Sequence, residues 1–204
     1  TSIREDSNGN LWLGTTTGVL CKFNKKKNAF SNYTFNKNLA DQPHSRIQGK
    51  IMIDEQDRIW TGTSAGLYVF NQEKEKFTHY KNEPGRTYSL SNNTVTSVLQ
   101  HRDKYWICTD HGGLNIFDPK SNRFFHYKYD KYDETSLSNN QLYKLLKDDN
   151  NTIWIGNYDG GVDFYNSKAT KFKKYKDLKP GKEKRSVISL SEDKEGNIWL
   201  GTDG

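Results

Sequence analysis

The chain has 204 residues, a formal net charge of +6 at pH 7, and a composition that is 32% hydrophobic and 13% aromatic. Its apolar residues are mostly aromatic or β-branched and lack the three-and-four spacing of an amphipathic helix, so we expect little helix. The longest apolar runs are far shorter than the roughly 20 residues of a membrane-spanning helix, which excludes such a helix from this sequence. The text begins in mid-pattern at Thr1, and we expect the natural N-terminus, with any export signal, to lie upstream.

Five tryptophans define an internal repeat of about 47 residues. They are separated by 48, 46, 48 and 45 residues. Four copies read Leu/Ile-Trp-x-Gly, and the third has Cys108 in place of the glycine. The tryptophans are Trp12, Trp60, Trp106, Trp154 and Trp199. The copies cover approximately residues 1–40, 41–91, 92–138, 139–184 and 185–204 of one partial domain.

Each copy predicts four strands in chain order. An alternating segment such as Val95, Ser97 and Leu99 comes first, and a turn rich in Asp, Asn and Gly follows. The Trp segment is the second strand, and a glycine turn leads into the third, which ends in an aromatic residue. The fourth strand reads Phe-x-x-Tyr and carries many lysines, which protect an open sheet edge from aggregation. The Phe positions are Phe30, Phe77, Phe124 and Phe172.

A four-stranded unit of this length is the size of one propeller blade, and radial packing buries both faces of each sheet. We therefore predict an all-β fold, a β-propeller fragment with about four four-stranded blades and the first two strands of a fifth. The five repeated tryptophans are expected in the core between blades, where large aromatic side chains bury much area. Because the last copy is incomplete, we expect an open arc whose exposed ends self-associate; a closed ring of four or five blades is the alternative.

The repeated pattern Asp-x-x-Gly-x-Leu/Ile-Trp-Leu/Ile-Gly-Thr, with the lead-in Ser-Leu-Ser-Asn-Asn at residues 89–93 and 136–140, resembles the two-component regulator propeller repeat. The resemblance covers essentially the whole chain. It implies part of a seven-bladed propeller in the periplasmic sensor region of a membrane-bound hybrid histidine kinase. It also implies further blades, an Ig-like domain and kinase modules outside this text, and a homodimer of the parent protein. Such sensors typically detect oligosaccharides and control genes for polysaccharide use.

Metal, disulfide and cofactor chemistry is not indicated. Cys21 and Cys108 occupy different positions of blades two apart, so we expect two buried free thiols. The acidic turns at residues 6–9, 54–57 and 148–151 lack the spacing of a calcium-binding EF-hand, and we interpret their Asp and Asn as turn caps. No histidine pair has the spacing of zinc ligands, so no metal or cofactor is expected.

The excess of positive charge lies mainly in turns and fourth strands. Residues 25–27 and the lysine-rich segment 168–184 are expected at the rim of the disc, where solvated lysines need no partner. A nucleic-acid surface is the alternative that charge alone allows. The aromatic residues are phased to the core rather than interleaved with these lysines, so no nucleic-acid partner is expected.

Candidate ligand-binding residues lie in the loops between the second and third strands, because these loops vary while the strands repeat. We expect a binding face formed by Arg46 with two loops. The loops are Thr109, Asp110 and His111, and Asn157, Tyr158 and Asp159. Carboxylates, an imidazole and a phenol suit a hydroxyl-rich or anionic ligand. The alternative is that these are ordinary hydrated turn residues.

Three functions are compatible with these features. A sensory ligand-binding module without catalytic activity of its own is favoured by the resemblance. A carbohydrate-active enzyme on a propeller scaffold would need two opposed carboxylates, and Asp110 and Asp159 are the one pair we would nominate. A scaffold for protein partners is the third, since fold alone does not select among them.

Overall fold

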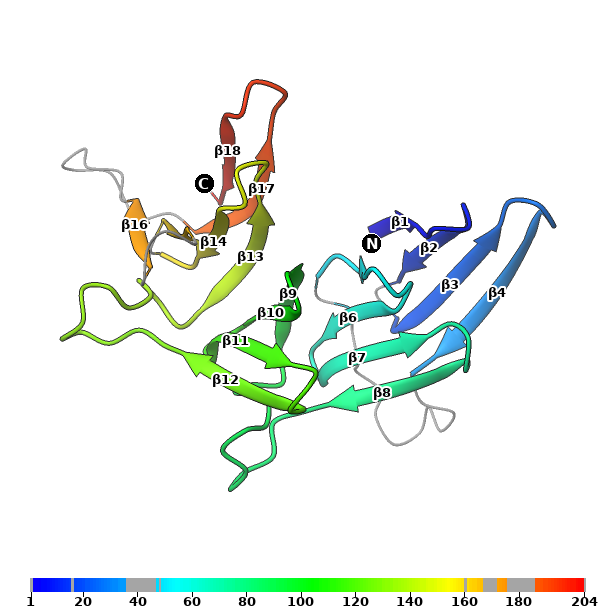
Figure 1. Ribbon diagram of the computed structural model, residues 1–204, viewed down its shortest axis with the longest axis horizontal. Helices are drawn as coiled ribbons and strands as arrows, with labels where there is room; N and C mark the ends of the chain where they lie inside the picture. The colour runs from blue at the N-terminus through cyan, green and yellow to red at the C-terminus, as the bar shows by residue number, and fades with distance from the viewer. Residues whose placement is uncertain are drawn as a thin grey trace. The chain divides into compact units, whose positions relative to one another are not determined.

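The computed structural model describes residues 2–15, 17–35, 47, 49–159, 161–166, 172–175 and 186–203 (Figure 1). These residues form strands and turns, with no helix among them. None of the described segments therefore has the helical length and hydropathy that a membrane crossing requires. The chain divides into two compact units, Thr1–Val98 and Leu99–Gly204, which are described separately.

The first unit holds two four-stranded antiparallel sheets with their strands in sequence order. One sheet contains β1 (Ser2–Glu5), β2 (Leu11–Gly14), β3 (Val19–Asn24) and β4 (Ala29–Thr34). The other contains β5 (Met52–Ile53), β6 (Ile59–Thr63), β7 (Gly66–Asn71) and β8 (Lys76–Tyr80). Strand β9 (Val95–His101) begins in this unit and ends in the second.

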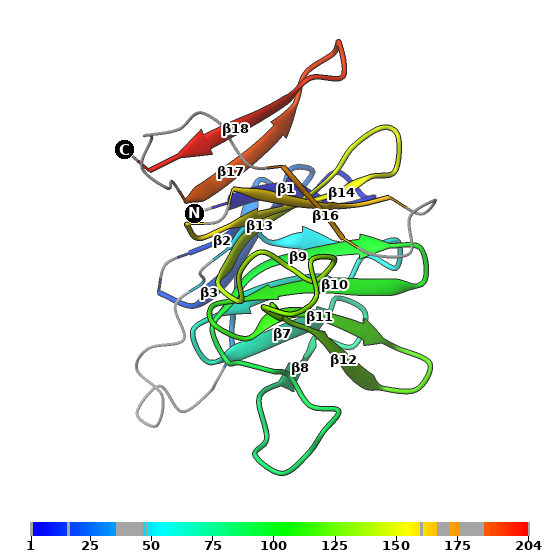
Figure 2. The ribbon, with the colours of Figure 1, turned by 90° about the vertical axis from the view of Figure 1, so that its left-hand side faces the viewer.

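The second unit continues the same plan. Strand β9 belongs to a four-stranded sheet with the order β9-β10-β11-β12, which adds β10 (Lys104–Thr109), β11 (Gly113–Asp118) and β12 (Arg123–Tyr127). The next sheet contains β13 (Leu142–Lys147), β14 (Ile153–Asn157), β15 (Val162–Tyr165) and β16 (Lys173–Tyr175). Strands β17 (Val187–Glu192) and β18 (Ile198–Thr202) form a two-stranded hairpin (Figure 2). The predicted all-β fold, with four four-stranded blades and two strands of a fifth, is confirmed.

Within each unit the core lies between successive sheets. In the first unit Trp12 is fully buried, and its ring lies 5.7 Å from that of Phe70 on the third strand of the next sheet. In the second unit Trp106 repeats this relationship, with its ring 5.2 Å from that of Tyr165. Trp60 is also buried, at 1% exposure. Trp12 and Trp106 therefore each pack one blade against the third strand of its successor.

Trp199 departs from the expectation for the five tryptophans. Its side chain is 65% exposed rather than part of the core, and Trp154 is only partly buried. The described sheet around Trp199 consists of β17 and β18, so no third strand or following sheet covers the indole. A neighbouring blade, and not the repeat sequence by itself, is what buries a Trp at this position.

Candidate ligand-binding site

The acidic turn before each Trp strand holds the indole in place. In the first copy Asp6 Oδ1 accepts hydrogen bonds from the backbone N–H of Asn8 and Asn10, and Asp6 Oδ2 accepts one from Trp12 Nε1 at 2.9 Å. Trp60, Trp154 and Trp199 donate in the same way to the Asp six residues earlier, each at 2.7 Å. The interpretation of these Asp residues as turn caps is confirmed, and the indole is an additional partner that the sequence did not indicate.

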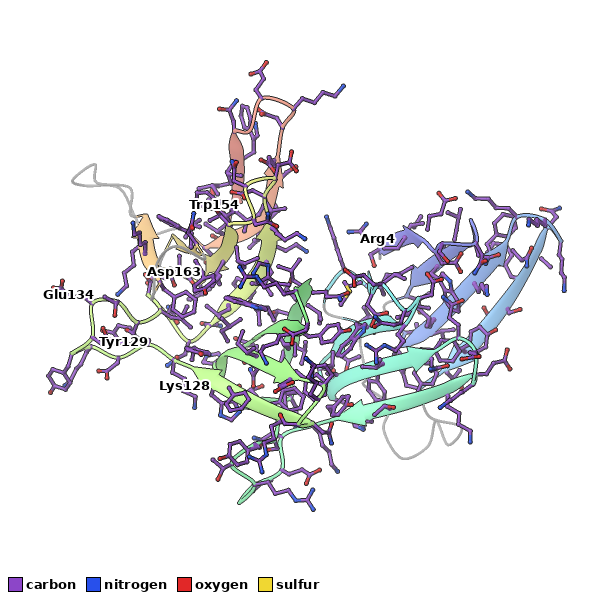
Figure 3. The ribbon with its side chains drawn as sticks, in the orientation of Figure 1. Arg4, Lys128, Tyr129, Glu134, Trp154 and Asp163 are labelled. Atoms are coloured by element: carbon purple, nitrogen blue, oxygen red, sulfur yellow. The ribbon has the colours of Figure 1, made fainter. Side chains whose placement is uncertain are left out.

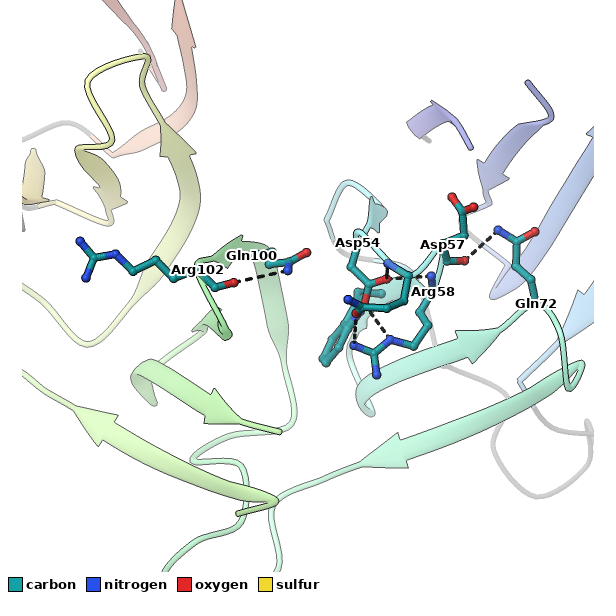
Figure 4. Close-up of polar contacts among 8 residues, drawn as sticks. Asp54, Asp57, Arg58, Gln72, Gln100 and Arg102 are labelled. Atoms are coloured by element: carbon teal, nitrogen blue, oxygen red, sulfur yellow. Dashed lines mark hydrogen bonds and ion pairs between the residues drawn. The ribbon is translucent and has the colours of Figure 1, made fainter. Parts of the chain in front are cut away.

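Figure 4 shows the second of these turns, where the guanidinium of Arg58 also reaches Asp54. Arg58 Nε lies 2.8 Å from Asp54 Oδ2. The third copy has a shorter turn with Gln100 at the position six residues before its Trp, and the Gln100 side chain donates to the carbonyl of Arg102 instead. Among the described residues there is no group of three or more His, Cys, Asp or Glu arranged to hold a metal ion.

The Ser-Leu-Ser-Asn-Asn lead-in fixes the connection that enters the fourth blade. Ser136 Oγ accepts from the backbone N–H of Asp130, and Leu137 is fully buried as an anchor. Asn139 Oδ1 accepts from Gln141 N at 2.9 Å, and Asn140 Oδ1 accepts from Tyr129 N at 2.8 Å. The copy at residues 89–93 repeats these contacts in the first unit. The motif therefore fixes the connection by which the chain runs from the fourth strand of one blade to the first strand of the next.

Ser138, the remaining residue of the lead-in, binds a buried carboxylate. Its backbone N–H and hydroxyl donate to the two oxygens of Asp163 on β15, at 2.8 and 2.6 Å. Asn157 Nδ2 adds a third hydrogen bond at 2.9 Å, and both Asp163 and Asn157 are fully buried. Asp163 is labelled in Figure 3. Burial raises the pKa of Asp163, although the hydrogen bonds from Ser138 and Asn157 oppose the shift. Sequence reasoning did not single out Asp163.

The first predicted loop follows β10. Thr109 is fully buried, and its hydroxyl donates to the carbonyl of Gly113 at 2.8 Å, so it closes the turn. His111 adopts a positive φ of 66° and is exposed. Its Nδ1 lies 2.8 Å from Asp110 Oδ1. His111 is therefore the exposed side chain of this loop, whereas Asp110 is partly buried and its Oδ1 atom is shielded from solvent.

The second predicted loop follows β14 and is tied to the lead-in. Tyr158 N donates to the carbonyl of Gln141 at 2.9 Å, and Asn139 Nδ2 donates to the carbonyl of Tyr158 at 2.7 Å. The Tyr158 side chain is 41% exposed, whereas Asn157 points inward to the buried carboxylate. Asp159 has a positive φ of 53° in the turn. Hydrogen bonds thus fix the backbone of this loop, while the phenol of Tyr158 remains partly exposed.

Tyr143 and Asp203 also belong to this region, and the sequence analysis did not predict either of them. A β-bulge between Leu142 and Lys144 displaces Tyr143 from the regular ladder of β13. The Tyr143 ring lies 6.0 Å from that of Tyr158, at an interplanar angle of 75°. Burial raises the pKa of Tyr143, and the carboxylates of Asp110 and Asp203 raise it further, so both carboxylates lie within Coulombic range of this phenol.

Asp203 could have been found by its place in the repeat. It stands four residues after its Trp, as Asp110 and Tyr158 do. Its backbone N–H donates to the carbonyl of Ser186, as that of Tyr158 does to the carbonyl of Gln141. Asp110, Tyr158 and Asp203 thus come from equivalent turns of three successive blades of the second unit, and the Tyr143 ring lies beside that of Tyr158. We call these four residues the tyrosine site.

Two other predicted features have different outcomes. Arg46 lies outside the described residues. Both cysteines are free, but only Cys108 is buried, because Cys21 is partly exposed. Burial raises the pKa of each thiol.

Comparison with known proteins agrees with the fold and the repeat. The sequence model of the two component regulator propeller matches residues 1–17, 136–159 and 181–204. In these three segments the chain is similar to two component regulator propeller repeats. No curated protein matches it in sequence at a significant level.

Solved structures provide full-length matches to the chain. The extracellular domain assigned to the hybrid two component system BT3049 of B. thetaiotaomicron is 28% identical, with a TM-score of 0.75 over 98% of this chain and 27% of that one. The extracellular domain of BT4673 from the same organism is 22% identical, with a TM-score of 0.77 over 100% of this chain and 28% of that one.

A third structure shares the fold alone. PorZ, a surface component of the type-IX secretion system of Porphyromonas gingivalis, is 15% identical, with a TM-score of 0.70 over 100% of this chain and 31% of that one. The chain thus spans about a quarter to a third of these structures. It has the β-propeller fold of extracellular sensor domains.

Proposed function

We propose that the chain is part of the ligand-binding propeller of a periplasmic sensor, in a membrane-bound hybrid two-component histidine kinase. The 28% identity over 98% of the chain to a domain assigned to such a system supports the proposal. The remaining blades, an Ig-like domain, the membrane span and the kinase would be other parts of the same protein. A homodimer of that protein would bring two sensor regions together. The chain itself would have no catalytic activity.

The ligand in this proposal is an oligosaccharide, and the response is expression of genes for polysaccharide use. The observation that carries the proposal is the tyrosine site: two partly exposed rings held edge to face, beside carboxylates from neighbouring turns. Aromatic faces pack against the C–H faces of a sugar ring, and carboxylates accept hydrogen bonds from its hydroxyls. His111 lies beside Asp110 and would add a further polar contact.

A ligand in this position would touch turns from three successive blades. It would act on the signalling equilibrium through the difference between its affinities for the two states. The lead-in is hydrogen-bonded to the turn that contains Tyr158 and continues directly into a first strand. A change in the spacing of the turns would therefore also move the first strands of the blades. The enzyme alternative would require two opposed carboxylates, such as Asp110 and Asp159, and the side-chain contact of Asp110 is with His111.

The test is a binding screen on the natural protein at full length. Calorimetry against soluble oligosaccharides from a broad set of polysaccharides should identify at least one ligand. A crystal structure with that ligand should place a sugar ring against Tyr143 or Tyr158. A ligand bound elsewhere, or no saccharide ligand in the whole set, would contradict the proposal.

A further inference from the structure

We propose that the connection between β12 and β13 docks against the same connection of a second copy of the protein. The first part of this connection, residues 128–136, is called the docking loop. The inference rests on the homodimer of the proposed function and identifies the surface on which two sensor regions would meet. It follows from the ordered backbone of the loop, its exposed tyrosines and the charges at its two ends.

The backbone of the docking loop is held by hydrogen bonds. Tyr129 N donates to Asn140 Oδ1 at 2.8 Å, and Asp130 N donates to Ser136 Oγ at 2.9 Å. Two turns close inside the loop, because Asp133 N donates to the carbonyl of Asp130 and Ser136 N donates to that of Asp133. A loop that is already ordered loses little conformational entropy when it binds a partner.

Three exposed tyrosines lie at the end of β12 and along the docking loop. Tyr127, Tyr129 and Tyr132 are 48%, 47% and 84% exposed. The matching loop of the preceding copy forms corresponding hydrogen bonds, yet it has Asn82 and Gly85 at the positions of Tyr129 and Tyr132. The fold of the loop therefore does not require these two tyrosines. Tyrosine is enriched in protein interfaces, because its ring buries much area and its hydroxyl forms hydrogen bonds.

The charges of the docking loop differ from those of the matching loop. In the preceding copy Arg86 Nη1 lies 2.6 Å from Glu83 Oε2, so these two charges are paired inside the loop. In the docking loop Asp133 stands at the position of that arginine, and the internal pair is lost. Figure 3 shows Lys128 and Glu134 at separate places along the loop. Neither forms an ion pair within the part of the chain that the structure describes.

A second copy of the same loop is complementary to this pattern. A two-fold symmetric contact uses the same surface on both sides, so two loops that run antiparallel would bring Lys128 of each copy to Glu134 of the other. The rings of Tyr129 and Tyr132 would then lie between the two ion pairs. Lys131 Nζ lies 4.6 Å from the centroid of the Tyr132 ring of its own loop, so this cation already has an aromatic partner.

The contact should be weak between copies that are free in solution. A single loop of this length offers less surface than the roughly 800 Å² per partner of a standard interface. Two copies held in one membrane have a higher effective concentration, which favours a second contact between proteins that are already close. The contact should therefore be measured in the full-length protein in its membrane.

Thiol cross-linking in the membrane tests the inference. Lys131→Cys places a thiol in the docking loop, and the control Thr87→Cys places one in the matching loop, both in a Cys21→Ser background. With a short bis-maleimide, Lys131→Cys should give a cross-linked dimer and Thr87→Cys should not. Adding Lys128→Glu or Glu134→Lys alone to the Lys131→Cys protein should lower the cross-linked fraction at least about threefold, because two exposed ion pairs are lost. Adding both together should restore it.

The outcomes separate the docking surface from the ligand site. Restoration by the paired charge reversal would exclude misfolding as the cause of the loss, because both substitutions are then present. Equal cross-linking of the Lys131→Cys and Thr87→Cys proteins, no cross-linking of either, or a fraction that the charge reversals leave unchanged would overturn the inference. Saccharide binding is measured independently by the calorimetric screen, so failure of the docking surface would not be confused with failure of the proposed ligand site.

Discussion

A side-chain carbon placed on Gly62 would lie 2.6 Å from the carbonyl oxygen of Val95, the first residue of the next blade's inner strand. The same repeat position shows the same relationship elsewhere, because a carbon on Gly14 would meet Ile51 and one on Gly156 would meet Val187. The glycine two residues after Trp12, Trp60 and Trp154 is thus required by the close approach of two strands from successive blades. It is a packing residue rather than a phosphate-binding one.

Gly62→Ala should therefore destabilise the protein by about 1–3 kcal/mol, the usual cost of overpacking against a fixed backbone. Denaturant unfolding would measure the change. Gly201→Ala is the matched control, since a carbon there would meet chiefly the Ser189 hydroxyl, which can rotate away. Equal destabilisation by the two substitutions would show that contact between blades is not the reason for the glycine.

The tryptophans should differ in their energetic importance although their sequence contexts are alike. Trp60→Ala should cost about 3–5 kcal/mol, because the buried indole leaves a cavity and the Asp54 carboxylate loses a donor. Trp199→Ala should cost far less in this chain, because its side chain is 65% exposed. Unfolding measurements on both variants test this, and a loss below about 1 kcal/mol for Trp60→Ala would rule out a core role.

The sequence was sufficient to predict the strands and their order in each blade, because the Trp period, the Asp-Gly turns and the aromatic third strands are all local signals. It was also sufficient to indicate Asp110 and Tyr158 as loop residues. It did not reveal Tyr143, because a bulge reorients this residue and bulges do not follow from alternation. It did not reveal Asp163 either, since a buried carboxylate requires the Ser138 donors 25 residues away, and only the fold brings them together.

The free energy of unfolding of the Asp163→Asn variant, compared with that of the natural protein, should increase as pH rises. The folded pKa of Asp163 is raised, so the folded state retains a proton that the unfolded state releases above about pH 3.9. Ionisation therefore costs stability as pH increases from that value through the folded pKa, and Asn removes this cost. Asn115 occupies the equivalent position of the preceding blade, so an amide is compatible with this site.

Unfolding curves of the Asp163→Asn variant and the natural protein from about pH 3.5 to 7 would measure the effect. Asp163→Ala is the control for lost hydrogen bonding, and should be destabilising at every pH because Ser138 and Asn157 lose their acceptor. A constant stability difference between the Asn variant and the natural protein across this range would contradict the account.

Asp193 should show the opposite pH behaviour. The indole of Trp199, with the backbone and side chain of Asn197, donates to this carboxylate and lowers its pKa to about 2. Stability from these bonds is present above the unfolded pKa of about 3.9 and is lost as pH falls through about 2. The NMR shift of the Trp199 indole N–H should titrate with a midpoint near 2, and Asp193→Asn should abolish this titration. A midpoint near 4, that of an unpaired carboxylate, would mean that the bond does not form.

The most direct test of the central claim is the effect of Tyr158→Ala on saccharide affinity. Tyr132→Ala is the matched control, because Tyr132 is 84% exposed and belongs to the connection between β12 and β13 rather than to one of these turns. With an oligosaccharide ligand from the screen, isothermal calorimetry should show at least about a tenfold weakening for Tyr158→Ala, which corresponds to about 1.4 kcal/mol. Tyr132→Ala should leave the affinity unchanged. Unchanged affinity in Tyr158→Ala, with the variant folded, would contradict a ligand site at these turns.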